Sequence, residues 1–221
     1  MSEGKFITFE GGEATGKSTQ IRLLADYLKK RDIDVIVTRE PGGTPEAERV
    51  RQILRGTDVD KWDGISETLL LYAARRNHVE KVIKPALAKG QWVVCDRFAD
   101  STRVFQAYGR HVPPEVIEQL HHLTLNDFEP DLTIVMDVPP IVSLKRTQKR
   151  AARPKPVHQE EDWFECMDMD FHERIYQGYR LLAKRYARCA LVDGTLQKER
   201  VHAIIADILY HRLDVPLVEG V

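Results

Sequence analysis

The sequence predicts an α/β fold, a three-layer sandwich in which a parallel sheet is flanked by helices on both faces. Short apolar runs rich in β-branched residues alternate with longer runs of helical periodicity, and this alternation is typical of βα units. The expected strands are apolar throughout, as strands buried on both faces of a sheet must be. They span residues 6–9, 34–38, 92–95, 132–136 and 190–192.

Helices are expected between these strands, because apolar residues recur there at every third or fourth position. The expected helices span residues 18–30, 44–54, 66–89, 114–125 and 198–213. With 221 residues, the chain is long enough for one well-filled core and short for two ordinary domains. We therefore expect a single domain covering residues 1–221.

The overall charge of the chain excludes a general attraction to polyanions. Lys and Arg total 33 against 34 Asp and Glu, which gives a formal net charge of -1. We therefore expect no nucleic acid and no anionic membrane as partner, and any anion site has to be local.

Cysteine usage and apolar segments indicate a cytoplasmic protein. Cys95, Cys166 and Cys189 lie far apart and form no Cys-x-x-Cys motif, which favours reduced structural thiols. No segment has the composition of a signal peptide or the length needed to span a bilayer.

One segment departs from this pattern by its charge. Residues 145–155 read KRTQKRAARPK, in which every charge is positive, and the acid-rich HQEEDWFE follows at 158–165. Pro154 and Pro156 interrupt any helix there. This composition is more typical of a mobile lid, at about residues 145–165, than of a core segment. From the charge pattern alone, a solvated helix end followed by a loop is the favoured interpretation.

A phosphate-binding motif lies between the first expected strand and the first expected helix. Residues 11–18, GGEATGKS, fit the P-loop pattern G-x-x-x-x-G-K-[ST] in its usual context. Backbone N–H groups at such a helix start bind phosphate oxygens, and glycine lets the backbone approach closely. We expect Lys17 to reach the β- and γ-phosphates of ATP and Ser18 to ligate Mg²⁺. The expected ATP-binding residues of the loop are Gly11, Gly12, Glu13, Ala14, Thr15, Gly16, Lys17, Ser18 and Thr19.

The motif alone does not identify the reaction. A glycine-rich turn with an exposed lysine is the structural alternative. Guanine-binding switch proteins carry an Asn/Thr-Lys-x-Asp motif, which does not occur here. Motor or recombinase ATPases usually have a longer chain or a basic face. A small kinase is the favoured class.

Two more cations follow expected strands. Arg39 comes directly after the strand at 34–38, and Asp96 and Arg97 come directly after the strand at 92–95. Because the carboxyl ends of parallel strands form the ligand-binding edge of a sheet, these residues should lie near Lys17. Three cations exceed what one triphosphate with Mg²⁺ requires, so we expect two phosphate-bearing substrates. Asp96 is a candidate ligand of Mg²⁺ or of its waters. Taken singly, a strand-end ion pair or a structural turn would explain each of these positions.

Together these motifs resemble those of bacterial thymidylate kinases. The resemblance extends from the first strand to about Thr195, through FEGGEATGKST, TREPGGT, LLYAARRNHVEKVIKPAL, CDRFADSTRVFQ, MDVPP and VDGT in the order of the family. It implies a P-loop nucleoside monophosphate kinase that phosphorylates thymidine monophosphate with ATP and Mg²⁺, by direct in-line transfer, as a homodimer. The alternatives are a kinase for another nucleoside monophosphate and a switch or nucleic-acid-dependent ATPase that uses the basic block.

The resemblance also implies roles for residues of the acceptor site. Arg39 and Arg97 would hold the acceptor phosphate, and Glu13 would face the sugar 3′-hydroxyl. The other implied acceptor residues are Leu71, Arg75 at the thymine edge, Ser101, Phe105 under the deoxyribose, and Gln106.

The base-reading helix departs from the family pattern. Most relatives carry phenylalanine four residues before the base-reading arginine, and Leu71 stands at that position here. Leu71 and Arg75 would share one helix face. The other register pairs Tyr72 with Arg76. We prefer the first, because residues 79–80 then align without a gap.

On the donor side, the resemblance implies that Arg146 and residues 193–195 contact adenine, although an ordinary turn would also explain 193–195. Some relatives place an arginine in the phosphate loop, three residues before its lysine, where this chain has Ala14. Because positioned cations supply most of the catalysis in phosphoryl transfer, the missing charge has to come from elsewhere. We expect Arg150 or Arg153 of the lid to supply it, together with Lys17 and Arg97 as catalytic residues. A basic loop without a catalytic role is the alternative.

Overall fold

The computed structural model describes residues 4–55, 62–151 and 167–217. Within these ranges the chain forms one sheet of parallel strands in the order β2-β3-β1-β4-β5. The strands are β1 (Phe6–Glu10), β2 (Val35–Arg39), β3 (Trp92–Asp96), β4 (Leu132–Asp137) and β5 (Cys189–Asp193). Every expected strand is present, and its bounds agree with the prediction to within one residue.

The helices agree less closely with the prediction. They are α1 (Lys17–Lys29), α2 (Pro45–Leu54), α3 (Gly64–His78), α4 (Lys84–Ala88), α5 (Ala99–Val104), α6 (Pro114–Leu125), α7 (Pro140–Ala151), α8 (Met169–Arg185) and α9 (Lys198–Leu213), with π-helical turns η1 (Val79–Ile83) and η2 (Phe105–Gly109). The sequence analysis did not predict α5, α7 or α8. For α8 the signal was present, because Phe171, Ile175, Tyr179 and Leu182 recur at helical spacing and are buried.

The prediction of a single helix at 66–89 was wrong in detail, because the chain there forms α3, η1 and α4 in succession. Pro85 has no N–H to donate, and its ring would clash with the carbonyl group one turn earlier. The turn before it widens, so that the N–H of Lys84 bonds to the carbonyl oxygen of Val79 five residues back. A π-helical turn thus accommodates the proline without ending the helical path.

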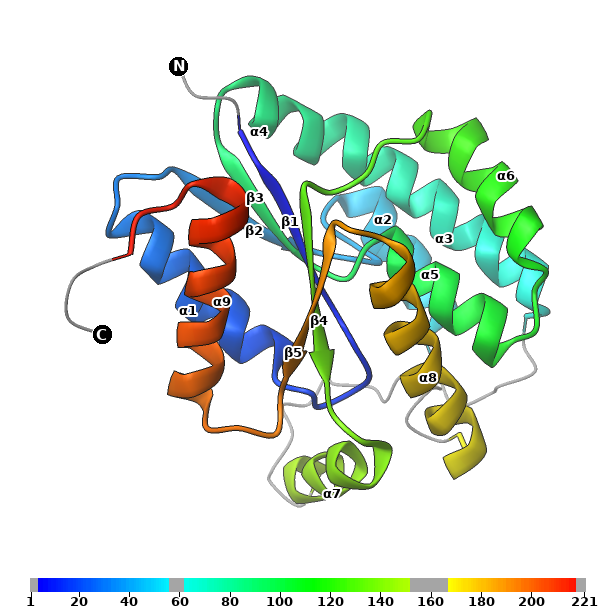
Figure 1. Ribbon diagram of the computed structural model, residues 1–221. Coiled ribbons are helices and arrows are strands. Elements are labelled where there is room, and N and C mark those ends of the chain that lie inside the picture. The colour runs from blue at the N-terminus through cyan, green and yellow to red at the C-terminus, as the bar shows by residue number, and fades with distance from the viewer. Residues whose placement is uncertain (1–3, 56–61, 152–166, 218–221) are drawn as a thin grey trace.

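Two layers of helices cover the sheet, as expected for a three-layer sandwich. In Figure 1, α1 and α9 lie on one face, while α3, α4, α5, α6 and α8 lie on the other. Side chains alternate along β1: Ile7 and Phe9 pack with α1 and α9, whereas Phe6 packs with α3 and α6. A third cluster, which includes Val135, packs β4 against α8. None of the described helices is both long and apolar enough to cross a membrane.

The carboxyl ends of the strands bring the predicted site residues together. Phe9 pairs with Asp96, and Asp96 pairs with Arg39, so β1, β3 and β2 end at the same level. The phosphate loop follows β1 at this edge, and Arg97 follows β3. Helix α7 lies at the same edge (Figure 1). The expected lid at about 145–165 therefore begins inside a helix, α7, and its part from residue 152 onward lies outside the described residues.

Candidate active site

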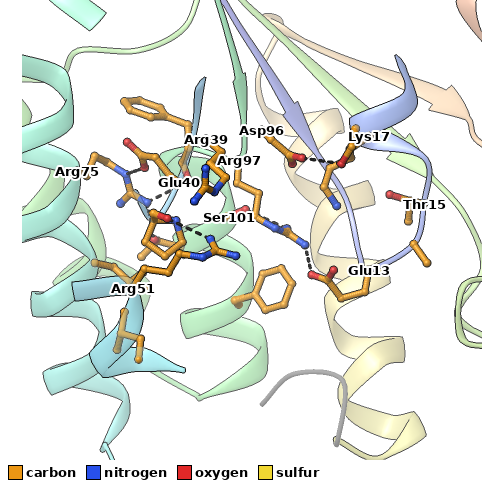
Figure 2. A pocket seen from close by; sticks show the side chains of 18 of the residues that line it. Glu13, Thr15, Lys17, Arg39, Glu40, Arg51, Arg75, Asp96, Arg97 and Ser101 are labelled. Atoms are coloured by element: carbon orange, nitrogen blue, oxygen red, sulfur yellow. Dashed lines mark hydrogen bonds and ion pairs between the residues drawn. The ribbon is translucent and has the colours of Figure 1, made fainter. Parts of the chain in front are cut away.

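A cavity of about 410 Å³ opens at the carboxyl edge of the sheet. Most residues that the sequence predicted for the site line it: Glu13, Ala14, Thr15, Gly16, Lys17, Ser18, Thr19, Arg39, Leu71, Arg75, Asp96, Arg97, Ser101, Phe105, Gln106 and Arg146. Figure 2 shows Arg75 and Glu40 at one end, Lys17 and Thr15 at the other, and Arg39 and Arg97 between them. The predicted site residues therefore lie around a single space.

The phosphate loop has the backbone geometry that its glycines permit. Gly11 and Gly16 have φ angles of 130° and 102°, a region that favours glycine. A Cβ atom on Gly11 would lie 2.8 Å from the carbonyl oxygen of Met136. The Lys17 ammonium donates to the carbonyl oxygen of Gly12 at 2.7 Å and to that of Gly11 at 3.2 Å. Burial, followed by the charge of Arg97, lowers the pKa of Lys17.

Arg97 connects the phosphate loop to α5. Its backbone has φ 70°, and its Nη1 donates to the Gly11 carbonyl oxygen at 2.9 Å. The same nitrogen donates to the hydroxyl oxygens of Ser101 and Tyr179, each at 3.2 Å, while Nη2 pairs with the Glu13 carboxylate. Although burial opposes its charge, Glu13 and the other anionic neighbours raise the pKa of Arg97. Its guanidinium is thus fixed beside the loop.

Glu10, which the sequence analysis did not select, lies at the centre of these contacts. The Ser101 and Tyr179 hydroxyl groups donate to its Oε2 at 2.6 and 2.9 Å. Its Oε1 accepts from the backbone N–H groups of Phe98 and Ser101 at 2.8 and 3.2 Å. Burial, reinforced by the nearby Asp100, raises the pKa of Glu10 from 4.5 to about 7. Two hydroxyl groups therefore connect the buried Glu10 carboxyl group to Arg97.

Arg39 is the most accessible of the three cations, with 53% of its side chain exposed. Its Nη2 lies 2.9 Å from both carboxylate oxygens of Glu48 in α2. Oε1 of Glu48 also accepts from the backbone N–H of Gly43 at 3.1 Å. Glu48 therefore holds the Arg39 guanidinium in place at the cavity wall.

Arg75 lies at the opposite end and is almost fully buried. Its Nε donates to Oε2 of Glu40 at 2.7 Å, and Oε1 of Glu40 lies 3.0 Å from Nδ1 of His78. Nη2 of Arg75 bonds to the Phe98 carbonyl oxygen and to the Thr102 hydroxyl. Its Nη1 has no hydrogen-bond partner within the described ranges. A buried donor is therefore available at this end of the cavity.

The structure decides between the two registers of α3. Leu71 and Arg75 both line the cavity, as the preferred register predicted. Tyr72 is buried in the core with α6, and Arg76 is half exposed and donates to the Thr124 carbonyl oxygen at 2.8 Å. The aromatic alternative therefore faces away from the cavity.

The donor-side residues lie near the start of α9. Nη2 of Arg146 in α7 donates to the Gly194 carbonyl oxygen at 3.0 Å. Asp193 accepts from the backbone N–H and the hydroxyl group of Thr195, which closes a turn. This contact places the segment at 193–195 beside Arg146. The side chain of Arg150 and the whole of Arg153 lie outside the described residues.

Several residues around the cavity were missed by sequence reasoning. Glu40, Arg51 and Glu67 line it. Glu40 follows Arg39 directly, and Glu67, Leu71 and Arg75 recur every four residues, so the signal of a shared helix face was present. Nη1 of Arg51 in α2 donates to the Pro41 carbonyl oxygen at 3.1 Å. No sequence pattern predicts this contact.

The candidate metal ligands fit Mg²⁺ bound with a nucleotide. The Ser18 hydroxyl lies 3.1 Å from Oδ2 of Asp96 at the mouth of the phosphate loop. No group of three or more His, Cys, Asp or Glu side chains suited to a metal occurs in the part of the chain that is described. Mg²⁺ commonly takes one or two protein ligands and completes its shell with phosphate oxygens and water. One hydroxyl and one carboxylate meet that requirement.

Comparison with known proteins shows that the chain is similar to nucleotide kinases. The sequence matches the thymidylate kinase family over residues 9–205. It is 46% identical to the thymidylate kinase of Caulobacter vibrioides over 214 residues, covering 96% of this chain and 99% of that protein. It is 50% identical to the thymidylate kinase of Afipia carboxidovorans over 212 residues, covering 95% of this chain and 90% of the relative. The crystal structure of thymidylate kinase from Ehrlichia chaffeensis superposes with a TM-score of 0.72, at 34% identity, over 94% of this chain and 99% of that one.

We predict that Glu10 makes the fold less stable as pH rises. Because its pKa is raised in the folded state, the folded protein keeps a proton that the unfolded chain loses between about pH 4.5 and about pH 7. Ionising the buried group costs roughly 3 kcal/mol over this range, at about 1.4 kcal/mol for each pH unit. Denaturant titrations near pH 5 and near pH 7.5 should show a larger loss of stability in the parent than in Glu10→Gln. The exposed Glu115→Gln serves as the control, and parallel curves for parent and Glu10→Gln would contradict the prediction.

Proposed function

Because the chain belongs to the thymidylate kinase family, and so transfers a phosphoryl group from ATP to thymidine monophosphate, we propose that the cavity holds the acceptor nucleotide and the phosphate loop holds the donor. The observation that carries this assignment is the placement of three cations, Lys17, Arg39 and Arg97, around one space. Family membership also resolves the choice that the sequence left open, in favour of thymidine monophosphate.

Arg39 and Arg97 are proposed to bind the acceptor phosphate. They lie in the middle of the cavity, and each guanidinium is already held by a carboxylate, Glu48 for Arg39 and Glu13 for Arg97. A guanidinium can present paired N–H groups to two phosphate oxygens, which fixes the position of the phosphate as well as its charge. Ser101, which accepts from Arg97, completes this end of the acceptor site.

The base and sugar of the acceptor would extend from there toward Arg75. Phe105 lines the cavity and lies 4.9 Å from the Arg97 guanidinium, where its ring can support the deoxyribose. Glu13 is the proposed partner of the 3′-hydroxyl. Nη1 of Arg75 is a buried donor that the base can satisfy, while Leu71 supplies apolar surface beside it. Gln106 is the second proposed polar contact to the base.

On the donor side, the phosphate loop is proposed to bind ATP, with Mg²⁺ held by Ser18 and by Asp96 or its waters. Mg²⁺ supplies charge neutralisation on the donor phosphates when bound. Lys17, freed from the carbonyl oxygens of Gly11 and Gly12, would donate to the β- and γ-phosphates. Arg146 is the proposed adenine contact. Full turnover in the presence of a chelator and without added Mg²⁺ would contradict the metal assignment.

The proposed reaction is a direct in-line transfer. An oxygen of the acceptor phosphate attacks the γ-phosphorus of ATP, the bond to the β,γ-bridging oxygen breaks, and ADP leaves. Charge spreads over the migrating group in such a transition state, so fixed cations lower the barrier without a covalent intermediate. Lys17 and Arg97 border this region. We propose that the enzyme is a single domain whose lid, at about residues 145–165, closes over the substrates. Arg150 or Arg153 in this lid is proposed to add the positive charge that Ala14 does not supply.

We also propose that the enzyme is a cytoplasmic homodimer. Its use of ATP favours the cytoplasm, and cell fractionation tests that location. Ile65 and Leu69 of α3 and Leu123 of α6 are large apolar side chains exposed by 48%, 49% and 79%. The contact of Arg76 with the Thr124 carbonyl oxygen joins α3 to α6 beside Leu123, two helical turns beyond Leu69. An apolar surface shared by two adjacent helices is typical of a contact between subunits.

We predict that Arg39→Ala and Arg97→Ala each raise the KM for thymidine monophosphate by about tenfold or more. Removing a charge-assisted bond to phosphate costs about 1.5 to 3 kcal/mol. The KM for ATP should change much less in both variants. Steady-state kinetics with each substrate varied in turn measures the two effects, with the exposed Arg22→Ala as the control. Unchanged acceptor kinetics in both variants would refute the assignment.

The lid arginines are predicted to act on kcat. The double variant Arg150→Ala/Arg153→Ala should lower kcat at saturating substrates by about 10³-fold, the effect typical of an arginine that contacts the transferred phosphoryl group. The two single variants then identify which arginine acts. Arg185→Ala, an exposed arginine in α8, provides a matched control. A double variant that turns over at the parent rate would exclude the lid mechanism.

The dimer proposal predicts that a charge at the α3–α6 surface separates the subunits. Leu69→Lys and Leu123→Lys would each bury an unpaired ammonium group in the contact, which is strongly unfavourable. Sedimentation velocity should show a dimer for the parent and monomers for these variants. Leu181→Lys, at a side chain of α8 exposed by 50%, should remain dimeric. A monomeric parent, or variants that stay dimeric, would contradict the proposal.

A further inference from the structure

The base end of the cavity contains a buried carboxylate whose role the reaction does not explain. Glu67 belongs to α3, one helical turn before Leu71 and two turns before Arg75, and only 4% of its side chain is exposed. Its Oε1 accepts from Nε2 of Gln106 at 3.4 Å, and its Oε2 lies 3.4 Å from Nε of Arg110. Arg110 also donates to the Trp62 carbonyl oxygen. Glu67 is thus held from one side by Arg110 and contacts Gln106 on the other.

A carboxylate can only accept hydrogen bonds, so its neighbour decides how the Gln106 amide is turned. The NH₂ group has to point at Glu67, because the amide oxygen there would leave two acceptors facing each other. Gln106 lines the cavity and is 1% exposed. If its amide rotated, the amide oxygen would face the Glu67 carboxylate, and water could not reach the two oxygens to separate them. The carbonyl oxygen of Gln106 is therefore on the side of the amide away from Glu67, and this oxygen can act only as an acceptor.

A second polar group at this end, the guanidinium of Arg75, is held as a hydrogen-bond donor. Glu40 holds Nε of Arg75, and Thr102 accepts from its Nη2, which leaves Nη1 as a donor. Thr102 lies one turn before Gln106 along α5 and η2, so the donor and the acceptor lie on neighbouring parts of the cavity wall. Arg75 can only donate, and Glu40 fixes its position. Gln106 could present either end of its amide, and Glu67 selects the end.

This pair matches one pyrimidine edge and opposes the other. Thymine presents O4 as an acceptor next to N3–H as a donor, whereas cytosine presents an N4 amino donor next to N3 as an acceptor. Arg75 and an acceptor at Gln106 can satisfy both atoms of thymine. With cytosine both contacts would face like groups, and a buried polar group left unpaired weakens binding strongly.

We propose that Glu67 is a specificity-determining residue, which positions the Gln106 amide so that the base site accepts thymine and rejects cytosine. The inference rests on the proposed contact of Gln106 with the base. Glu67 itself is a positioning residue and does not touch the substrate. Its substitution should therefore change the choice of base, while ATP binding stays as it is.

The test is the ratio of kcat/KM for thymidine monophosphate to kcat/KM for deoxycytidine monophosphate. Glu67→Gln keeps the shape of the side chain but adds a donor, so the Gln106 amide can turn either way. We expect this ratio to fall by about tenfold or more, through loss with thymidine monophosphate and gain with deoxycytidine monophosphate. The KM for ATP should stay within about twofold of the parent value. Glu67→Asp keeps the charge beside Arg110 but shortens the side chain, and the ratio should fall in this variant too.

Two further variants separate the possible outcomes. Glu118→Gln makes the same chemical change at a carboxylate that pairs with Nε of Arg103 at 2.9 Å outside the cavity, and it should keep the parent ratio. Gln106→Leu tests the proposed base contact itself. If Gln106→Leu keeps the ratio, that contact is wrong and the inference fails with it. If Gln106→Leu lowers the ratio while both Glu67 variants retain it, only the role of Glu67 is refuted. An equal fall in Glu118→Gln would also refute it.

Discussion

The buried carboxyl group of Glu10 joins the end of β1 to the start of α5, and the shape of the cavity depends on that contact. Backbone N–H groups of Phe98 and Ser101 donate to it, so it fixes the turn in which Arg97 adopts a positive φ angle. The Ser101 and Tyr179 hydroxyl groups donate to Glu10 and accept from the Arg97 guanidinium, so they also restrict the position of that guanidinium. Since the phosphate loop begins one residue after Glu10, the same carboxyl group connects that loop with Arg97. The fold therefore fixes the position of Arg97 relative to the phosphate loop.

Every arginine expected to contact the acceptor is held by a carboxylate. Glu48 holds Arg39, Glu13 holds Arg97, and Glu40 holds Arg75. Burying an unpaired charge is strongly unfavourable, so pairing is what allows cations to collect in a partly closed site. The carboxylates also reduce the freedom of long side chains, and a ligand then loses less entropy by ordering them. A chain with a net charge near zero can therefore still gather a local surplus of cations around one cavity.

The site combines two kinds of recognition that the fold keeps apart. Around the phosphate loop, recognition uses backbone groups and full charges, which any nucleotide phosphate can satisfy. At the end of the cavity near Arg75, polar groups come from α3 and from the α5–η2 segment, and buried carboxylates orient them. Charge supplies most of the binding of phosphate, whereas directional hydrogen bonds in a buried space supply the discrimination between bases.

The sequence by itself determined the strands, the phosphate loop and the gathering of Lys17, Arg39 and Arg97 at one edge. These features follow from local rules: strand periodicity, a contiguous motif, and the common direction of parallel strands. Packing decided the rest. Arg75 lines the cavity, whereas Arg76 bonds to the Thr124 carbonyl oxygen, because Tyr72 is buried against α6 and fixes the rotation of α3. Pro85 turned an expected helix into two joined by a π-helical turn. The partners of Glu10, Glu40 and Glu67 lie 35 to 169 residues away from them in the chain. No local pattern encodes such pairs, because they form only when helices from distant segments pack on the same sheet.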